Sequence, residues 1–221
     1  MRNNGADIIK IKKLRKDGSI NSDIVEKISV SIKSREIVVL PIDNVYGVIG
    51  VSEPKVEKRI CKLLRVDETK FVRLISSFKM LNETACYTKF DYDFLNRVWP
   101  GEVNVILKDR VSHNRKQDLI TIRYPRNKFL QSVIDSVDSP LIISKACNKN
   151  NDVIYRKEDI INSFYHKVKL IVIIEELCKK HPISTLIDIS SGNLKILREG
   201  KVTSDEIKSL YFLGKDDDLV Y

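Results

Sequence analysis

The sequence predicts a mixed α/β or α+β fold, in which helices cover a sheet. Runs of β-branched residues alternate along the chain with segments whose apolar residues recur at helical spacing. The sequence shows no internal repeat or low-complexity tract, which argues against a solenoid. With 221 residues, 43% of them hydrophobic, the chain can bury a substantial core. We therefore expect one domain over residues 1–221 rather than two very small ones.

The strands are predicted from short apolar runs bounded by turn-forming residues. Ile37–Leu40 is continuously apolar, so it should be buried on both faces and end at Pro41. Leu119–Arg123 alternates as a half-buried strand does. The other expected strands are Ile8–Leu14, Phe71–Ser76, Val103–Leu107, Leu141–Ile143, Leu170–Ile174, and the hairpin-like pair Thr185–Ile189 and Leu194–Leu197.

The helices are predicted from apolar stripes and from capping residues. Proline in the first turn begins the helix Pro54–Leu64. Thr203 and Glu206 form a capping box that begins the last helix, which runs to about Leu210. The other expected helices run from Ser22 or Asp23 to Ser34, over Asp91–Val98 and Asn127–Val137, and around Glu158–Phe164; the polar stretch Lys145–Asp152 should be a loop.

Charge and cysteine content bound the class of protein. Lys and Arg total 39 against 30 Asp and Glu, a net charge of +9, so the surface attracts polyanions such as RNA and nucleotides, although a solvated lysine-rich surface gives the same count. Four scattered cysteines indicate reduced thiols rather than a zinc site or a redox dithiol. No apolar run reaches eighteen residues and no signal peptide is visible, so we expect a cytoplasmic protein without a membrane span.

Two segments combine a buried strand or core anchor with a turn. In PIDNVYG (41–47), proline and glycine flank polar residues at the end of a strand, where open α/β sheets bind ligands. A tight turn with a packed tyrosine explains the same residues. In WPGEVN (99–104), Pro-Gly imposes a turn and the sole tryptophan should anchor it in the core. Each segment alone is compatible with a purely structural role.

Two further segments place arginine beside apolar or hydroxyl residues. Arg123, between Ile122 and Tyr124, should meet an anion because an unpaired buried guanidinium is costly; a salt bridge to an acidic residue would satisfy it equally. Two hydroxyls, Ser184 and Thr185, with Arg198 on the hairpin partner, can converge on a phosphate or carboxylate. A capped strand end and a surface arginine are the structural alternative.

In order and spacing these segments resemble the YrdC-like family, the threonylcarbamoyl-AMP synthases. Its signatures PTDTVYG, KxR followed by KPL, WPGPLT, Arg-x-Pro, SAN, ST-x-x-D and LR-x-G are matched by PIDNVYG (41–47), LLR (63–65) and TKF (69–71), WPGEVN (99–104), RYP (123–125), KAC (145–147), STLID (184–188) and LREG (197–200). The resemblance spans about residues 20–210 and is to the short, single-domain form. It implies a twisted, open mixed sheet with helices around a basic concave cleft.

The resemblance also implies a reaction. L-threonine, bicarbonate and ATP, usually with Mg²⁺, yield threonylcarbamoyl-AMP and pyrophosphate, and a partner tRNA threonylcarbamoyl transferase then modifies tRNA. The resemblance also implies tRNA or double-stranded RNA as a partner that binds the basic face. Such a reaction depends mostly on positioning and charge stabilisation. The alternative is a catalytically impaired relative that holds RNA or a nucleotide on the same face.

Matched residue by residue, the resemblance assigns both substrates. It implies ATP-binding positions at Arg65, Lys145, Cys147 and Arg198, and threonine-binding positions at Ile42, Arg123 and Ser184, with no protein metal ligand and no separate catalytic residue. Several positions depart from the family: Ile42 and Asn44 replace threonines, Leu63 replaces a lysine, and Asn104 replaces a threonine. Lys145 and Cys147 replace the Ser and Asn of SAN, and Lys70 is displaced by one position from the lysine of KPL. Lys145 should compensate for the cation lost at Leu63.

Overall fold

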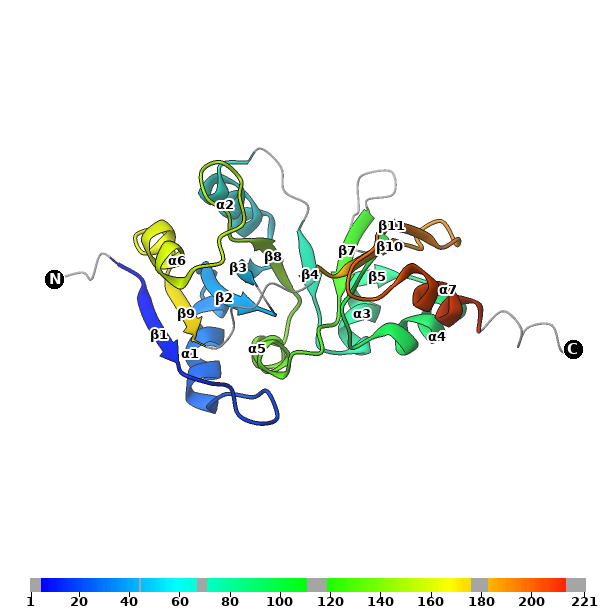
Figure 1. The fold of residues 1–221 in the computed structure, drawn as a ribbon, viewed down its shortest axis with the longest axis horizontal. Helices are drawn as coiled ribbons and strands as arrows, with labels where there is room; N and C mark the ends of the chain where they lie inside the picture. The colour runs from blue at the N-terminus through cyan, green and yellow to red at the C-terminus, as the bar shows by residue number, and fades with distance from the viewer. Residues whose placement is uncertain (1–4, 44, 67–70, 111–118, 176–182, 214–221) are drawn as a thin grey trace, which may run out of the picture. The chain divides into compact units, whose positions relative to one another are not determined.

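The computed structural model describes residues 5–43, 45–66, 71–110, 119–175 and 183–213, and in these the predicted mixed α/β fold is confirmed. The predicted roles of Asn44, Thr69 and Lys70 lie outside the described residues. The helices, shown in Figure 1, are α1 (Ser22–Lys33), α2 (Pro54–Leu64), α3 (Phe78–Thr84), α4 (Lys89–Val98), α5 (Lys128–Val137), α6 (Lys157–Phe164) and α7 (Ser204–Phe212). The strands are β1 (Asp7–Ile11), β2 (Val38–Ile42), β3 (Val45–Val51), β4 (Val72–Leu74), β5 (Ala85–Cys86), β6 (Val103–Asp109), β7 (Leu119–Arg123), β8 (Leu141–Lys145), β9 (Leu170–Ile174), β10 (Thr185–Asp188) and β11 (Lys195–Arg198).

The chain divides into two compact units, the first formed by Met1–Phe71 and Asn127–Lys180 and the second by Val72–Arg126 and His181–Tyr221. The strands of the first unit are hydrogen-bonded in the order β1-β9-β2-β3-β8, and those of the second in the order β4-β7-β6-β10-β11, with β5 beside β6. Parallel and antiparallel pairs occur in both units. Whether residues 1–221 form a single domain remains a prediction.

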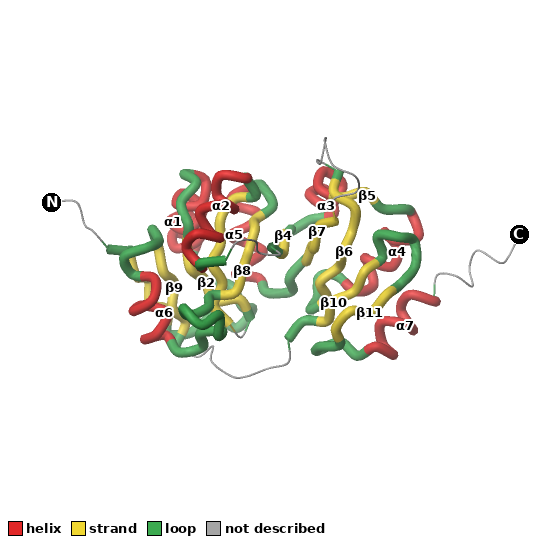
Figure 2. The backbone as a smooth tube through the Cα atoms, turned by 90° about the horizontal axis from the view of Figure 1, so that it is seen from above, coloured by secondary structure: helices red, strands yellow, loops and turns green. Residues whose placement is uncertain are grey.

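In the first unit, α1 packs on α5 beside the strands, as Figure 2 shows. The hydroxyl of Ser136 donates to that of Ser29 at 2.9 Å between these helices. Every residue of β9 is buried, as expected for a strand covered on both faces. The apolar stripe of α1 is buried at Ile28 and Ile32. Burial of these apolar stripes is what stabilises the unit.

The prediction that Pro41 ends its strand was wrong. β2 continues through Pro41 to Ile42 and pairs with β3, so PIDNVYG is the tip of an antiparallel hairpin. Asp43 turns the chain there with a φ of 49°, the left-handed region that Asp and Asn tolerate best after glycine. The loop prediction for Lys145–Asp152 also began too early, because Lys145 is the last residue of β8. The chain therefore places Ile42 and Lys145 at strand ends.

In the second unit, β6 lies in the middle of the strands and alternates between two environments. Val103, Val105 and Leu107 are fully buried, whereas Asn104 and Ile106 are half-buried. The Trp99 prediction is confirmed: the side chain is buried and its indole N–H donates to the Val103 carbonyl at 2.8 Å. The predicted capping box of Thr203 and Glu206 is also confirmed.

Candidate functional site

Two of the predicted arginines, Arg123 and Arg198, lie on one face of the sheet in the second unit. The pairing of β6 with β7 determines the face on which Arg123 lies. Val105 and Ile122 pair directly and are both fully buried, so they point into the core. Because successive side chains of a strand point to opposite faces, their neighbours Asn104 and Arg123 point to the other face. Asn104 and Arg123 thus lie on the face opposite Val105 and Ile122.

The same face continues across β10 to β11. Asn104 pairs with Leu186, and Leu186 pairs with Arg198. Residues paired across neighbouring strands point to the same face. Arg123, Asn104, Leu186 and Arg198 therefore form a row across four strands, which we call the polar row. The second unit brings Arg123 and Arg198 to one face, with a register shift in the β10–β11 pairing between Leu186 and Ile187.

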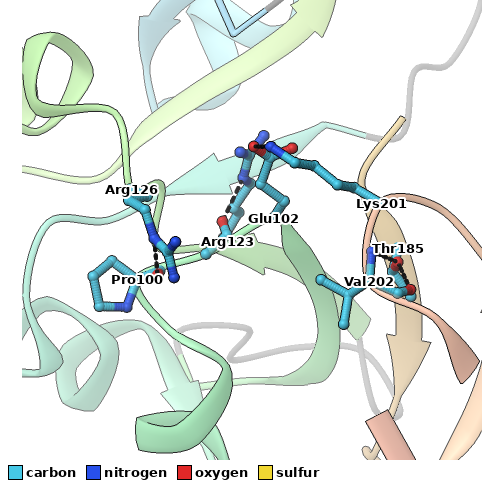
Figure 3. A network of polar contacts seen from close by, with 8 residues as sticks. Pro100, Glu102, Arg123, Arg126, Thr185, Lys201 and Val202 are labelled. Atoms are coloured by element: carbon cyan, nitrogen blue, oxygen red, sulfur yellow. Dashed lines mark hydrogen bonds and ion pairs between the residues drawn. The ribbon is translucent and has the colours of Figure 1, made fainter. Parts of the chain in front are cut away.

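Arg123 is held in place by the Trp99–Gly101 turn. Its side chain is only 6% exposed, and its Nε donates to the Gly101 carbonyl at 3.1 Å. Figure 3 shows this contact together with Arg126, whose Nε donates to the Pro100 carbonyl at 3.4 Å. The backbone carbonyl of Arg123 accepts from the amide of Ile75 at 3.0 Å. The bond from Nε to the Gly101 carbonyl orients the Arg123 guanidinium.

The second unit does not aim both neighbouring hydroxyls at a ligand. Thr185 is completely buried, and its hydroxyl donates to the Val202 carbonyl at 2.5 Å and accepts from the Val202 amide (Figure 3). The same hydroxyl also accepts from the Gly200 amide. The prediction that Thr185 converges with Ser184 on an anion was therefore wrong, because pairing with the following loop uses the Thr185 hydroxyl. Ser184 itself is half-buried, and its hydroxyl has no hydrogen-bond partner among the described residues.

Arg198 is anchored to the strand that carries Ser184. Its Nε and Nη2 both donate to the Ser184 carbonyl, at 3.3 and 3.0 Å. The side chain is half-buried and lines a hollow of about 500 Å³ between β11 and α7, together with Leu197, Lys208 and Tyr211. The arginine predicted to reach the nucleotide is thus positioned beside the serine predicted to reach threonine.

In the first unit, three predicted residues lie around the β2–β3 hairpin. Lys145 pairs with Gly47, and the amide of Ala146 donates to the Tyr46 carbonyl at 2.8 Å. Ile42 is buried, and its Cδ1 occupies the space where a side chain on Gly47 would begin. The structure therefore gathers Ile42, Lys145 and Cys147 on adjoining segments, with the exposed Lys145 as their cation.

Cys147 is a half-buried thiol close to a positive charge. Burial raises its pKa above the ordinary value, the charge of Lys145 lowers it in part, and Asp152 raises it. Burial dominates, so the thiol is protonated at neutral pH. A thiol of this kind acts as a small apolar or weakly hydrogen-bonding group rather than as a nucleophile.

At pH 8 we expect Cys147 to react with iodoacetamide roughly tenfold more slowly than the exposed Cys86, because the thiolate is the reactive form. A folded-state pKa above the unfolded one also means that stability falls as the pH rises past about 9. Peptide mass spectrometry during alkylation measures both rates in one sample. Equal rates at the two cysteines would contradict this account of Cys147.

Arg65 lies directly after α2 rather than within it. It adopts the left-handed conformation, with φ 60° and ψ 43°, and its amide and that of Val66 cap the last turn by donating to carbonyls of Lys62 and Cys61. Its side chain is exposed. The cation is therefore presented from a helix end.

The family model and the solved structures that match this chain agree. Residues 31–200 match the family model Sua5_yciO_yrdC, described as "Telomere recombination". The chain belongs to the Sua5/YciO/YrdC family. The fold matches that of E. coli YciO with a TM-score of 0.77 at 17% identity, covering 91% of this chain and 98% of that one.

Two further solved structures share the fold. P. abyssi Sua5 complexed with L-threonine matches with a TM-score of 0.78 at 20% identity, covering 92% of this chain. Full-length HypF in a phosphate- and nucleotide-bound form matches with a TM-score of 0.66 at 8% identity, covering 80% of this chain. The chain spans 60% of the Sua5 chain and 29% of the HypF chain.

The Sua5/YciO/YrdC match runs through segments of both compact units, and the predicted site residues divide between them. The first unit carries Ile42, Arg65, Lys145 and Cys147, and the second carries Arg123, Ser184 and Arg198. Their roles toward threonine and ATP remain predictions.

Asn104 is a polar-row residue that the sequence analysis noted only as a departure from the family. The signal was present in the alternation of β6, where a polar residue stands between two buried valines.

The described residues contain no group of three His, Cys, Asp or Glu side chains that could hold a metal ion. Nor does any described helix have the length and apolar character needed to cross a membrane.

Proposed function

We propose that this chain is an L-threonylcarbamoyladenylate synthase, a nucleotidyltransferase acting in the threonylcarbamoyladenosine modification of tRNA. The observation that carries the proposal is the family match over residues 31–200. The likeness in fold to a Sua5 structure holding L-threonine supports it. The substrates would be L-threonine, bicarbonate and ATP, and the products threonylcarbamoyl-AMP and pyrophosphate.

For threonine, we assign Arg123 to the carboxylate. A guanidinium in a fixed orientation can pair with both oxygens of a carboxylate, and the bond to the Gly101 carbonyl supplies that orientation. Ser184 would contact the amino acid through its hydroxyl, and the buried Ile42 would contact it through methyl groups. The donations of Arg198 to the Ser184 carbonyl would keep the arginine assigned to ATP beside the serine assigned to threonine.

For ATP, we assign Arg65, Lys145 and Arg198 to the phosphates and Cys147 to a neighbouring contact. The amino nitrogen of threonine takes up bicarbonate as a carbamate with loss of water; a carbamate oxygen then attacks the α-phosphorus, and pyrophosphate leaves. The cations stabilise the charge that develops on the phosphates. Magnesium would enter as the complex with ATP.

The same proposal implies a downstream enzyme, an RNA partner and a cellular location. The product would pass to a tRNA threonylcarbamoyl transferase in the cytoplasm, and the net charge of +9 would favour tRNA or double-stranded RNA near the protein. We also retain the proposal that the two units are parts of one Sua5/YciO/YrdC domain.

The test is pyrophosphate release from the purified chain with magnesium, ATP and bicarbonate, with and without L-threonine. The proposal requires release that depends on threonine and bicarbonate, together with threonylcarbamoyl-AMP detected by mass spectrometry. D-threonine in place of L-threonine is the matched control. Absence of turnover combined with salt-sensitive RNA binding would instead support the second candidate, a catalytically impaired RNA- or nucleotide-binding protein. The observation favouring that candidate is the buried, apolar Ile42 against Gly47, where the family has a hydroxyl.

We expect Lys145→Ala to weaken ATP binding roughly tenfold, because an exposed ammonium at the end of β8 would lose its contact with the triphosphate. Isothermal titration calorimetry with magnesium and ATP at two salt concentrations measures the loss, which should shrink at high salt. Lys149→Ala, an exposed lysine in the loop that follows, is the control and should bind as the parent does. Unchanged affinity in Lys145→Ala would remove this residue from the ATP site.

A further inference from the structure

The side-chain oxygen of Asn104 is buried, and no described residue donates a hydrogen bond to it. Burying an amide oxygen without a donor costs free energy, and nearly all such groups in folded proteins have a partner from protein, water or ligand. A group outside the described residues should therefore donate a hydrogen bond to this oxygen.

Asn104 stands inside the polar row, next to Arg123. Each lies one residue beyond the direct pair of Val105 and Ile122. Residues facing each other across antiparallel strands have Cβ atoms about 4.5–5.5 Å apart. The neighbouring residues on this face, Ile106 and Leu186, are half-buried. The side-chain oxygen of Asn104, an acceptor, and the guanidinium of Arg123, which attracts anions, therefore belong to neighbouring residues on one face.

These two groups together define a ligand. An amide oxygen accepts only from an N–H or O–H group, while a guanidinium attracts an anion. An α-amino acid carries both features on one carbon, as a carboxylate and an amino group. We infer that Asn104 binds the amino nitrogen of the amino-acid substrate through its side-chain oxygen. The inference rests on the proposed function, and the contact can persist after carbamate formation because that nitrogen keeps one N–H.

The sole tryptophan reports on this position. The Trp99 indole N–H donates to the carbonyl of Val103, the residue that precedes Asn104 in the chain. Ligand binding at Asn104 should change the backbone next to this hydrogen bond and therefore the emission of Trp99. Titration followed by Trp99 fluorescence, with calorimetry as a second readout, measures binding without requiring turnover.

The experiment compares two ligands on the full chain. L-threonine has the amino group, whereas (R)-3-hydroxybutyrate keeps the carboxylate and hydroxyl but lacks it. We expect Asn104→Ala to weaken L-threonine binding roughly ten- to hundredfold and to change 3-hydroxybutyrate binding less than twofold. Asn96→Ala is the matched control, because that amide is exposed and donates to the Tyr92 carbonyl of its own helix. Equal losses for both ligands, or no loss, would overturn the inference.

A second variant keeps the inference testable if Asn104→Ala does not fold. Asn104→Leu keeps the branched shape of the side chain, removes the acceptor and should show the same selective loss. If either folded variant binds L-threonine as tightly as the parent, water is the partner of Asn104 and the inference fails while the proposed function stands. If the parent chain itself binds no L-threonine, the proposed function fails, and the inference fails with it.

Discussion

Replacing Arg123 with lysine should weaken L-threonine binding and threonine-dependent pyrophosphate release roughly a hundredfold. The substitution keeps the charge but removes the planar fork that suits a carboxylate, and it removes the Nε donor to the Gly101 carbonyl. The buried carbonyl then loses a partner, which adds about 1–2 kcal/mol of destabilisation. Calorimetric titration with L-threonine and a pyrophosphate-release assay measure the two functional effects.

Arg126→Lys is the matched control for Arg123. Arg126 is exposed, follows the same strand, and bonds the neighbouring Pro100 carbonyl through its own Nε at 3.4 Å. It should therefore bind L-threonine as the parent chain does. An Arg123→Lys variant that is folded and binds threonine normally would show that the guanidinium serves only to brace the turn.

Gly200→Ala should destabilise the fold by about 3 kcal/mol. A Cβ at this position would lie 2.6 Å from the carbonyl carbon of Ser184 and 2.7 Å from the amide nitrogen of Thr185, and would overlap the Ile183 carbonyl. All three obstacles are backbone, so no side chain can swing aside. The strain would be transmitted to the Thr185 hydroxyl, which accepts from the Gly200 amide.

Urea denaturation followed by circular dichroism measures the loss at Gly200. Gly192→Ala is the comparison: its φ of 78° makes any side chain costly, but no atom lies within 4 Å of the added Cβ. That variant should lose only about 1 kcal/mol. Equal losses at the two glycines would show that backbone conformation, and not steric overlap, is what requires glycine at position 200.

Elements with a local signal were predictable from the sequence. Proline begins α2, the Thr203–Glu206 box begins α7, and the apolar run of β9 was placed with its observed bounds. β3 was missed because Gly47 and Gly50 resemble turn residues. In the structure these glycines leave room for Ile42, Ile143 and Val56, which pack from neighbouring elements. The need for glycine here comes from residues of other elements, so the sequence of β3 alone does not reveal it.

The candidate site was predictable only in part for a similar reason. Motif order identified Arg123 and Arg198, which the second unit places on one face. It did not show that Thr185 turns inward, because the loop partner Val202 lies seventeen residues away in the chain. Nor did it identify Asn104 as a buried acceptor, since burial of one atom depends on strands that pair across long stretches of sequence.

The left-handed backbone at Arg65 carries one more consequence. A side chain in that conformation costs about 1–2 kcal/mol relative to glycine, the residue most often found after a helix. Arg35 adopts the same conformation and forms an ion pair with Glu53, whereas Arg65 has no such partner among the described residues. The left-handed conformation of Arg65 therefore costs free energy that no ion pair with a described residue offsets.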